Sequence, residues 1–285
     1  MTNAFNPSQK FVSISITGLK CELMCRYCKG KYLKEMIPAT TPRALYETIR
    51  YYYRRGFRGF LISGGFTVRG FLNVEPFLPV IKDVKREFRD IVISIHPGLI
   101  DKSLIIKLKE AKIDIVDFEF SLSKLYIRYV KNMKKASPMD YCKTYELLEK
   151  YGPPYIAPHV VINPFTEEYE YEVAFHELEY LHDHNPHIMV LLIYIPTPNT
   201  PSSNDAVPGI SYVSRIFEHA RRLFKEVSLG CMRPRLGNYR VLVDKMALDY
   251  DFDRIVNPHK SLMSRVRSVI GTCCSVPKEL LHLFQ

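Results

Sequence analysis

Three cysteines on one short segment are the residues with the clearest chemical meaning in this chain. Cys21, Cys25 and Cys28 follow the apolar segment Phe11–Thr17, and their spacing is CxxxCxxC. Thiolates are preferred protein ligands of iron–sulfur clusters, and a cubane cluster has four irons to coordinate. Three local thiolates would therefore bind three irons and leave the fourth open to a substrate or cofactor. An open coordination position distinguishes a catalytic metal centre from a closed structural one.

Two other roles for these cysteines have to be weighed. The three thiolates and a distant histidine could form a structural zinc site, although such sites commonly use two CxxC pairs and no second pair follows here. Disulfides are disfavoured because the chain has seven cysteines, an odd number, and its start, MTNAFNPSQK, lacks the apolar stretch of a secretion signal. We therefore expect free thiols in the reducing cytoplasm, which suits an oxygen-sensitive cluster.

The composition limits the kinds of partner. The chain has 285 residues, of which 47% are hydrophobic, enough for one large α/β domain or two smaller ones. Its longest apolar run, Ile188–Ile195, is far shorter than the ~20 residues that a membrane span requires, so we expect no membrane segment. The net charge of +10 fits solvated helix faces, but it could also attract an acidic partner such as nucleic acid, a carrier protein or a ferredoxin.

The elements that must position the cysteines follow from an alternation of apolar β-rich runs and amphipathic helical stretches. The expected strands are Phe11–Thr17, Phe60–Ser63, Ile91–His96, Ile113–Phe120, Tyr155–Ile162 and Ile188–Ile195, with weaker runs at Val227–Leu229 and Arg254–Val256. Helical stretches between them include Pro42–Arg55, Leu104–Ala111, Tyr169–His182 and Tyr212–Lys225. Thr41 and Pro42 form a typical helix start, with a capping residue before a proline in the first turn.

This alternation predicts a parallel sheet covered by helices. Eight such units favour a TIM-type (β/α)8 barrel that could be incomplete at its last two strands. Because no Ser/Gly-rich linker divides the chain, we assign residues 1–268 to the barrel and residues 269–285 to a C-terminal tail. The active sites of such barrels lie at the C-terminal ends of the strands. The cysteine loop follows the first strand and so falls on the catalytic face.

Other strand ends also carry candidate residues. Gly64 and Gly65 close the second run, where paired glycines would let a ligand approach the backbone, although a tight turn alone would explain them. His96 ends the third run and is as consistent with a structural role as with a functional one. The loop after the sixth run, Ile195–Pro201, is stiffened by three prolines.

Together these segments resemble the radical S-adenosylmethionine (SAM) superfamily. The run CELMCRYC, Cys21–Cys28, is similar to its CxxxCxΦC signature, including the aromatic Tyr27, and Ser63-Gly64-Gly65 resembles its glycine motif. The resemblance implies a [4Fe–4S] cluster held by Cys21, Cys25 and Cys28, with SAM chelating the open iron. One electron would then cleave SAM to a 5′-deoxyadenosyl radical that takes hydrogen from an unactivated carbon.

The same resemblance implies roles for the other strand ends. It assigns Gly64 and Gly65 to the methionine end of SAM and adds His96 to the cofactor-binding candidates. It places Tyr27 near the adenine, flanked by the segment from Ile195 to Thr197.

A narrower resemblance is to the biotin synthase subgroup. The loop IPTPNTP is similar to its P-x-x-G-T-P loop, with Asn199 where glycine is usual. The segments Lys31–Pro42, Ser94–Asp101 and Leu229–Arg240 resemble archaeal proteins that act as a two-component lipoyl synthase. This similarity implies sulfur insertion into an octanoyl chain on an acidic carrier protein, the lipoyl domain, with a reducing ferredoxin and a sister radical SAM subunit as further partners.

Sulfur insertion needs a sulfur source, which in related enzymes is a second iron–sulfur cluster. Cys231 follows a late strand, and Cys273 and Cys274 lie in the tail, so we predict that these three converge on an auxiliary cluster; buried, unreactive thiols are the alternative. Arg233 and Arg235 are predicted to face the cavity, where they would recognise a substrate carboxylate or ligate a cluster in the biotin synthase manner.

Two departures from the superfamily pattern keep other functions open. Phe66 replaces the acidic or small residue usual after the glycines, and the fifth unit, His159–Pro164, lacks a glycine-rich continuation. A diverged, non-catalytic partner subunit is therefore one alternative. A radical SAM enzyme that acts on RNA or on a small molecule, as biotin synthase does, is another. The sequence carries no RNA-binding module that would favour RNA.

Overall fold

The computed structural model describes residues 2–165 and 168–284, without the side chains of residues 168 and 169. Within these residues eleven strands form one sheet, and every strand pair is parallel. The strands are β1 Asn3–Phe5, β2 Phe11–Ser15, β3 Ile37–Pro38, β4 Gly59–Ser63, β5 Val92–Ile95, β6 Ile115–Phe120, β7 Tyr155–Ile162, β8 Met189–Ile193, β9 Val227–Leu229, β10 Arg254–Val256 and β11 Val269–Ile270.

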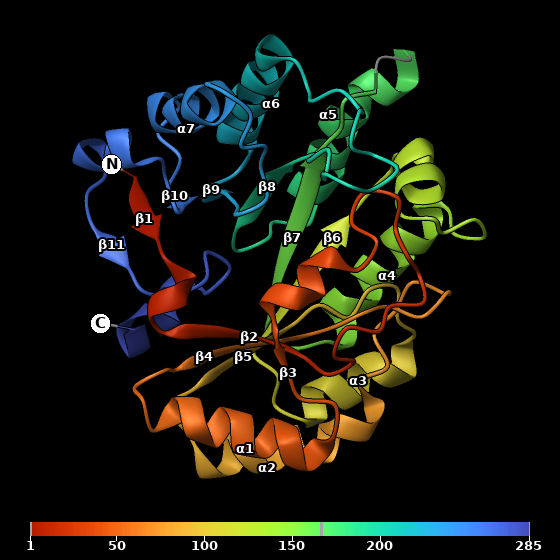
Figure 1. Cartoon of the computed structure of the whole chain (residues 1–285), viewed down its shortest axis with the longest axis vertical. Coiled ribbons are helices and arrows are strands. Elements are labelled where there is room, and N and C mark those ends of the chain that lie inside the picture. Colours follow the sequence, from red (N-terminus) through yellow and green to blue (C-terminus); the bar gives the residue numbers. More distant parts are fainter. Residues whose placement is uncertain (1, 166–167, 285) are drawn as a thin grey trace.

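Helices follow the strands and lie on the outside of the curved sheet (Figure 1). The α-helices are α1 Pro42–Tyr53, α2 Leu78–Glu87, α3 Lys102–Glu110, α4 Pro138–Tyr151, α5 Glu168–Asp183, α6 Ile210–Leu223 and α7 Tyr239–Asp249. Shorter helical turns are η1 Pro7–Gln9, η2 Lys31–Glu35, η3 Glu75–Phe77, η4 Tyr126–Val130, η5 Lys260–Arg265 and η6 Lys278–Phe284.

The sheet order confirms the predicted β/α barrel and shows where it stays open. The order is β11-β1-β10-β9-β8-β7-β6-β5-β4-β2-β3, so the eight predicted strands are consecutive neighbours. β2 pairs with β3 and β4, whereas β10 pairs with β9 and β1, and no ladder joins β2 to β10. The incomplete closure falls after the last two strands of the repeat, as the sequence indicated.

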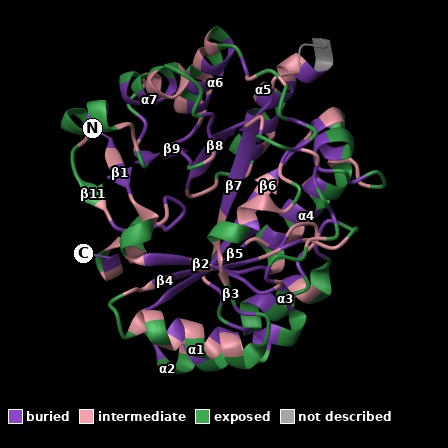
Figure 2. Cartoon of the chain, viewed as in Figure 1, coloured by how far each residue is buried: buried purple, intermediate pink, exposed green. Residues whose placement is uncertain are grey.

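The local signals explain why the elements begin where they do. Thr41 caps α1, because its Oγ1 accepts a hydrogen bond from the N–H of Ala44 at 3.1 Å, and Pro42 opens the helix. The strands read as nearly continuous apolar runs because a parallel sheet is buried on both faces. Figure 2 shows buried strands inside a layer of helices whose outer faces are exposed. No described helix is long and apolar enough to cross a membrane.

The tail from residue 269 is bound to the sheet. Its first residues form β11, which pairs with β1. The buried Arg254 of β10 donates hydrogen bonds to the carbonyl oxygens of Cys274, at 2.7 Å, and Val276, and pairs with Glu226. These contacts hold the two tail cysteines against the late strands.

A buried carboxyl on α5 makes the stability of the fold depend on pH. The Oε1 of Glu177 accepts hydrogen bonds from Ser121 Oγ at 2.9 Å and Leu122 N at 2.7 Å, in the loop after β6. Burial raises the pKa of Glu177 from 4.5 to about 8. Between these two values only the unfolded chain loses the proton, so the free energy of unfolding falls as the pH rises.

We therefore predict that Glu177→Gln flattens this decline and raises the free energy of unfolding at pH 8 by at least about 1 kcal/mol. Urea titrations at pH 5 and pH 8 measure the difference. Glu179→Gln, on the exposed face of the same helix, is the matched control. A pH slope in Glu177→Gln equal to that of the wild type would contradict the prediction.

Candidate cluster and cofactor site

The cysteine loop lies at the C-terminal end of β2 and is held by backbone hydrogen bonds. The N–H groups of Glu22 and Leu23 donate to the carbonyl oxygen of Phe66, at 2.9 and 3.0 Å. The N–H of Arg26 donates to the carbonyl oxygen of Val130 at 2.8 Å. Because a backbone carbonyl makes the anchor, the unusual side chain at position 66 does not alter it.

The three thiols lie on one loop, which is anchored at Phe66 and Val130. Cys25 and Cys28 share a hydrogen bond, which raises the pKa of Cys25 and lowers that of Cys28 to about 7, so one thiolate forms readily near neutral pH. Cys21 Sγ lies 3.9 Å from the carbonyl oxygen of Phe66. Among the described residues no three His, Cys, Asp or Glu side chains converge on a single metal ion. Ligands of a cubane need not do so, since each thiolate binds a different iron.

Gly65 lies directly against this loop. A Cβ at Gly65 would stand 2.0 Å from the carbonyl oxygen of Lys20 and 2.5 Å from Cys21 Cα, so only glycine fits. The N–H of Gly65 donates to Thr17 Oγ1 at 2.6 Å, which leaves that amide satisfied within the protein. The structure thus places Gly65 against the cysteine loop and Gly64 against Thr17 and Leu72, and it commits one of the expected backbone donors to Thr17.

The loop after β8 packs on the other side of the cysteine loop. Thr197 Oγ1 and the Tyr32 hydroxyl are 2.8 Å apart, and Ser202 Oγ donates to the carbonyl oxygen of Tyr27 at 3.4 Å. The Tyr27 ring lies 6.1 Å from Tyr32 and 6.5 Å from Tyr194, between centroids.

An ion pair at 3.0 Å between Arg26 and Asp205 ties the same two loops together. The loop that carries half-buried Ile195 and buried Thr197 is therefore held against the loop that carries Tyr27.

Charged residues inside the barrel were not predicted from the sequence. Lys131 Nζ donates to Glu119 Oε1 at 2.7 Å, and the two side chains are only 9% and 18% exposed. Burial alone would raise the pKa of Glu119, but the Lys131 ammonium holds it below its usual value. The Lys131 charge also acts to lower the pKa of both Cys25 and Cys28.

A signal for part of this group is present in the sequence IVDFEF of β6. Alternation places Asp117 and Glu119 on one face of the strand, with Phe118 and Phe120 on the other. Since the apolar face packs against helices, the acidic pair has to face the barrel interior. Asp117 is buried, and its Oδ1 has no hydrogen-bond partner among the described residues.

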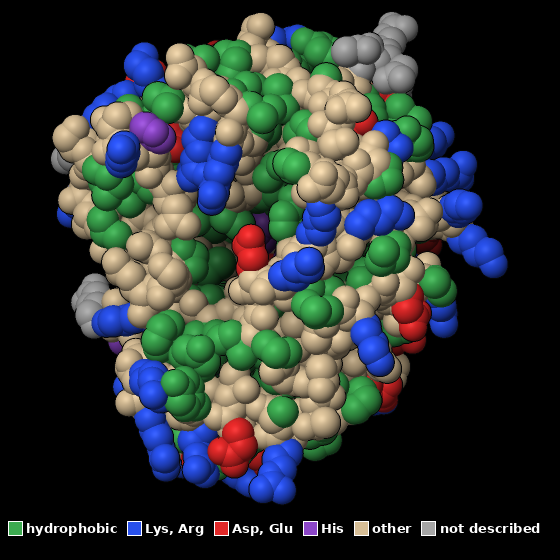
Figure 3. Space-filling view, viewed as in Figure 1, with side chains coloured by type: hydrophobic (Ala, Val, Ile, Leu, Met, Phe, Trp, Pro, Cys, Tyr) green, Lys and Arg blue, Asp and Glu red, His purple; other side chains and the backbone are tan. Residues whose placement is uncertain are grey.

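His96 also lies in the interior, with its ring 5.9 Å from that of His159. Burial lowers the pKa of His96, which favours the neutral ring near pH 7. Figure 3 shows a hollow near the centre of the viewed face, bordered by hydrophobic and charged side chains.

We predict that Lys131→Met destabilises the fold by about 3–5 kcal/mol, because it leaves the Glu119 carboxylate buried without its partner. The double variant Lys131→Met/Glu119→Gln should recover most of that loss. Chemical denaturation of the two variants measures both effects, with Lys134→Met on the exposed surface as control. Equal stability of the single and double variants would contradict the prediction, because the loss would then not come from an unpaired Glu119 carboxylate.

Two of the three cysteines of the predicted auxiliary group, Cys273 and Cys274, are neighbours in the tail, whereas Cys231 follows β9. Cys273 and Cys274 share a hydrogen bond, which lowers the pKa of Cys273 and raises that of Cys274. Cys231 is exposed, Cys273 is half-buried and Cys274 is buried. Cys273 Sγ lies 3.2 Å from Ser275 Oγ.

Arg233 and Arg235, the two arginines predicted to bind substrate, lie in different surroundings. Arg233 does not face the cavity: its side chain is fully buried, its Nε donates to Asp244 at 2.6 Å, and its Nη2 donates to the carbonyl oxygen of Val256 at 2.7 Å. The expectation for Arg233 is wrong because a neighbouring buried carboxylate takes up its guanidinium. Arg235, two residues later, is exposed and lines a pocket.

Comparison with known protein families identifies the superfamily of this chain. The sequence profile described as "Radical SAM superfamily" matches residues 15–175, more than half of the chain. This chain is a radical SAM protein. Members use a [4Fe–4S] cluster with SAM, and the match spans the cysteine loop, both glycines and the strands from β4 to β7. None of the curated protein sequences matches the radical SAM chain.

Solved structures share the fold. Methylornithine synthase (PylB) is 13% identical with a TM-score of 0.60, and the alignment covers 87% of this radical SAM chain and 72% of PylB. The maturase HydG from Carboxydothermus hydrogenoformans is 15% identical with a TM-score of 0.57, covering 90% of this chain and 58% of HydG. SuiB from Streptococcus suis, solved with SAM bound, is 12% identical with a TM-score of 0.53, covering 89% and 49%. At these identities the likeness shows the fold alone, and the chain spans much less than the whole of HydG or SuiB.

Proposed function

We propose that Cys21, Cys25 and Cys28 hold the [4Fe–4S] cluster of a SAM-cleaving enzyme that inserts sulfur into an octanoyl chain attached to a carrier protein. The proposed cluster and SAM cleavage are supported by one observation above all. The three-cysteine loop packs against Gly65 at the C-terminal ends of the neighbouring parallel strands β2 and β4. When bound, the cluster and SAM would supply one-electron cleavage of a sulfonium to a 5′-deoxyadenosyl radical.

The protein's own residues position the cofactor and shield it from water. Tyr27, Ile195 and Thr197 form the wall assigned to the adenine, and Gly64 and Gly65 form the wall assigned to the methionine end. The neutral His96 ring and the Asp117 carboxylate, whose Oδ1 has no partner among the described residues, are polar groups available to SAM or substrate in the interior.

A second group of thiols supports sulfur insertion as the outcome of the reaction. Cys231 follows β9, and Arg254 on the neighbouring strand β10 holds the tail that carries Cys273 and Cys274 through the carbonyl oxygens of Cys274 and Val276. We propose that they bind an auxiliary iron–sulfur cluster that donates sulfur. Arg235 is retained as a candidate for substrate binding.

The proposed partners follow from the charge and the chemistry. The net charge of +10 suits an acidic lipoyl domain as carrier. Reductive cleavage consumes an electron, so a reduced ferredoxin is the proposed donor, and a sister radical SAM subunit is proposed to complete the reaction. We propose cytoplasmic localisation, in line with reduced cysteines.

The test is anaerobic reconstitution with iron and sulfide, followed by reaction with SAM, a reductant and an octanoylated peptide, with and without the sister subunit. Formation of 5′-deoxyadenosine together with a sulfur-containing peptide supports the proposal. 5′-Deoxyadenosine with an unmodified peptide would exclude the octanoyl substrate as assayed, and RNA or a small molecule would then be the next substrate to test. No 5′-deoxyadenosine under any condition would indicate a non-catalytic partner subunit.

The auxiliary cluster makes a separate prediction about iron content. After reconstitution, the triple variant Cys21→Ala/Cys25→Ala/Cys28→Ala should keep roughly half of the wild-type iron, because a second set of thiolates remains. Adding Cys231→Ala, Cys273→Ala and Cys274→Ala should remove the rest. Iron and sulfide analysis with visible absorption measures both. A triple variant without iron would refute the auxiliary cluster and leave the SAM site untouched.

A further inference from the structure

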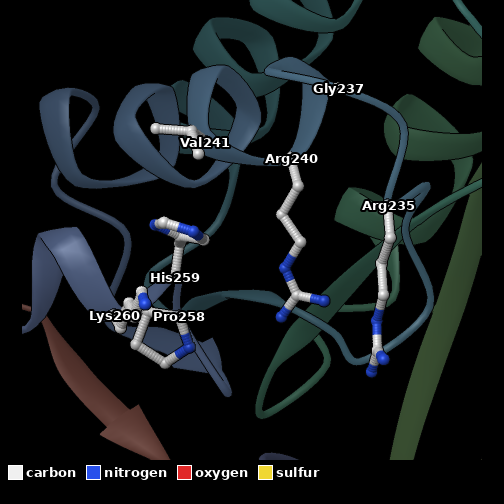
Figure 4. A pocket seen from close by; sticks show the side chains of 7 residues that line it. All are labelled: Arg235, Gly237, Arg240, Val241, Pro258, His259 and Lys260. Atoms are coloured by element: carbon white, nitrogen blue, oxygen red, sulfur yellow. The ribbon is translucent and has the colours of Figure 1, made fainter.

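A basic pocket of 420 Å³ lies between the loops that follow β9 and β10. Figure 4 shows Arg235 and Arg240 extending side by side from the loop after β9 and the start of α7, with His259 and Lys260 on the neighbouring segment. Gly237 and Val241 complete the apolar part of the lining. No acidic residue lines the pocket.

The positive charge of this pocket is largely uncompensated. In the described part of the chain Arg235 and Lys260 form no ion pair. Arg240 Nε lies 3.5 Å from Asp244, but that carboxylate also accepts hydrogen bonds from Arg233 Nε at 2.6 Å and from the N–H of His259 at 2.7 Å. Desolvation and the charges of Arg233 and Arg235 lower the pKa of Arg240. The pocket therefore presents an excess of positive charge.

The start of α7 adds backbone donors to the same pocket. The N–H of Tyr239 donates to Leu236 O, and the N–H of Leu242 donates to Asn238 O. Between them, the N–H groups of Arg240 and Val241 donate to no backbone or side-chain acceptor among the described residues, and both residues line the pocket. Free N–H groups and the helix dipole favour an anion at such a position.

The position of the pocket in the barrel points to a particular anion. β9 and β10 are the seventh and eighth strands of the β/α repeat. In (β/α)8 barrels a phosphate site is frequently formed by the loops after strands 7 and 8 together with a helix N-terminus. A phosphate monoester has three acceptor oxygens and a charge of about −1.5 to −2, which suits several cations and two amides better than a carboxylate does.

We propose that this pocket binds the phosphate monoester group of a small-molecule ligand. Arg235, Arg240 and Lys260 contact the phosphate oxygens, and the amides of Arg240 and Val241 complete the site. The volume of 420 Å³ exceeds that of a phosphate group, so the pocket has room for part of the attached molecule. The pocket opens at the strand ends that carry the cysteine loop, so the ligand is presented on the catalytic face. This inference does not rest on the octanoyl substrate.

The test measures binding to the reconstituted full chain by isothermal titration calorimetry, with inorganic phosphate, ribose 5-phosphate, AMP and citrate as separate probes. Arg235→Gln/Lys260→Gln removes two exposed cations of the pocket. Lys82→Gln/Arg86→Gln removes two exposed cations of α2 and is the charge-matched control. Circular dichroism confirms that both variants are folded.

We expect at least one phosphate ester to bind the wild-type chain with a dissociation constant below about 10 mM. The pocket variant should bind the same ester at least about 10-fold more weakly. The control variant should bind it as tightly as the wild type does. Equal weakening in the two variants would assign the effect to net charge and overturn the proposal. Tighter binding of citrate than of every phosphate ester, or no binding of any ester, would also overturn it. Because binding is measured without turnover, either result is independent of the proposed sulfur insertion.

Discussion

Replacing Cys25 with alanine is expected to abolish SAM cleavage, with 5′-deoxyadenosine formation falling more than roughly 1,000-fold, which corresponds to about 4 kcal/mol of lost transition-state stabilisation. Cys25 is buried and shares a hydrogen bond with Cys28, and the loop contains no cysteine besides Cys21, Cys25 and Cys28 that could take its place. The neighbouring backbone bond from Arg26 N to Val130 O does not involve the side chain and should keep the loop in position. The variant should therefore fold but fail to hold an intact cluster.

Two measurements test this expectation together. Iron and sulfide content after anaerobic reconstitution reports the cluster, and chromatography of the reaction with SAM and dithionite reports 5′-deoxyadenosine. Cys142→Ala, on α4 away from the loop, is the matched control and should keep wild-type activity. Retention of a substantial fraction of activity by Cys25→Ala would mean that this loop does not hold the catalytic cluster.

Gly65→Ala is the second substitution with a large expected effect. The added methyl group would stand 2.0 Å from Lys20 O, 2.5 Å from Cys21 Cα and 2.6 Å from Cys21 Cβ. Two of these atoms belong to the backbone, so the cysteine loop itself has to move. We expect a loss of about 1–3 kcal/mol in the free energy of unfolding. SAM cleavage should fall about 100-fold, since a displacement near 1 Å can cost that much in a positioned reaction.

The control for Gly65→Ala is Gly209→Ala at the start of α6, where a new Cβ meets no atom within 4 Å. It should change SAM cleavage less than about two-fold. The reconstituted iron content separates two explanations, because a displaced loop that still binds iron would lose activity without losing the cluster. Wild-type activity in Gly65→Ala would show that the loop and the glycines can move apart without effect.

The fold was predictable because it depends on patterns that repeat along the chain. Parallel strands buried on both faces are apolar throughout, and amphipathic helices separate them, so the eight units can be read in order. Val227–Leu229 and Arg254–Val256 were predicted with their observed bounds despite their length. The strands β1, β3 and β11 were not predicted. They are two or three residues long, so their sequences carry too little pattern, and only their hydrogen bonds to neighbouring strands identify them.

Candidate site residues could be predicted from the sequence where they all lie on one loop after a strand. Cys21, Cys25 and Cys28 share a loop, and their spacing alone predicts a ligand set. Arg233 shows the limit of this reasoning, because its sequence neighbours gave no indication of the Asp244 carboxylate that buries it. Lys131 is another case: nothing near it in sequence shows that it reaches Glu119 on β6.

By itself, the sequence determined the β/α repeat, the CxxxCxxC loop and the face of the barrel on which this loop stands, because each follows from local spacing and strand direction. The tertiary structure alone decided which charges neutralise each other, since ion pairs join residues from different strands and loops. It showed that Arg233 is buried in an ion pair with Asp244, whereas Arg235 is exposed and lines the basic pocket. It also brought the start of α7 beside the loop after β10, and this juxtaposition of distant segments creates the basic pocket.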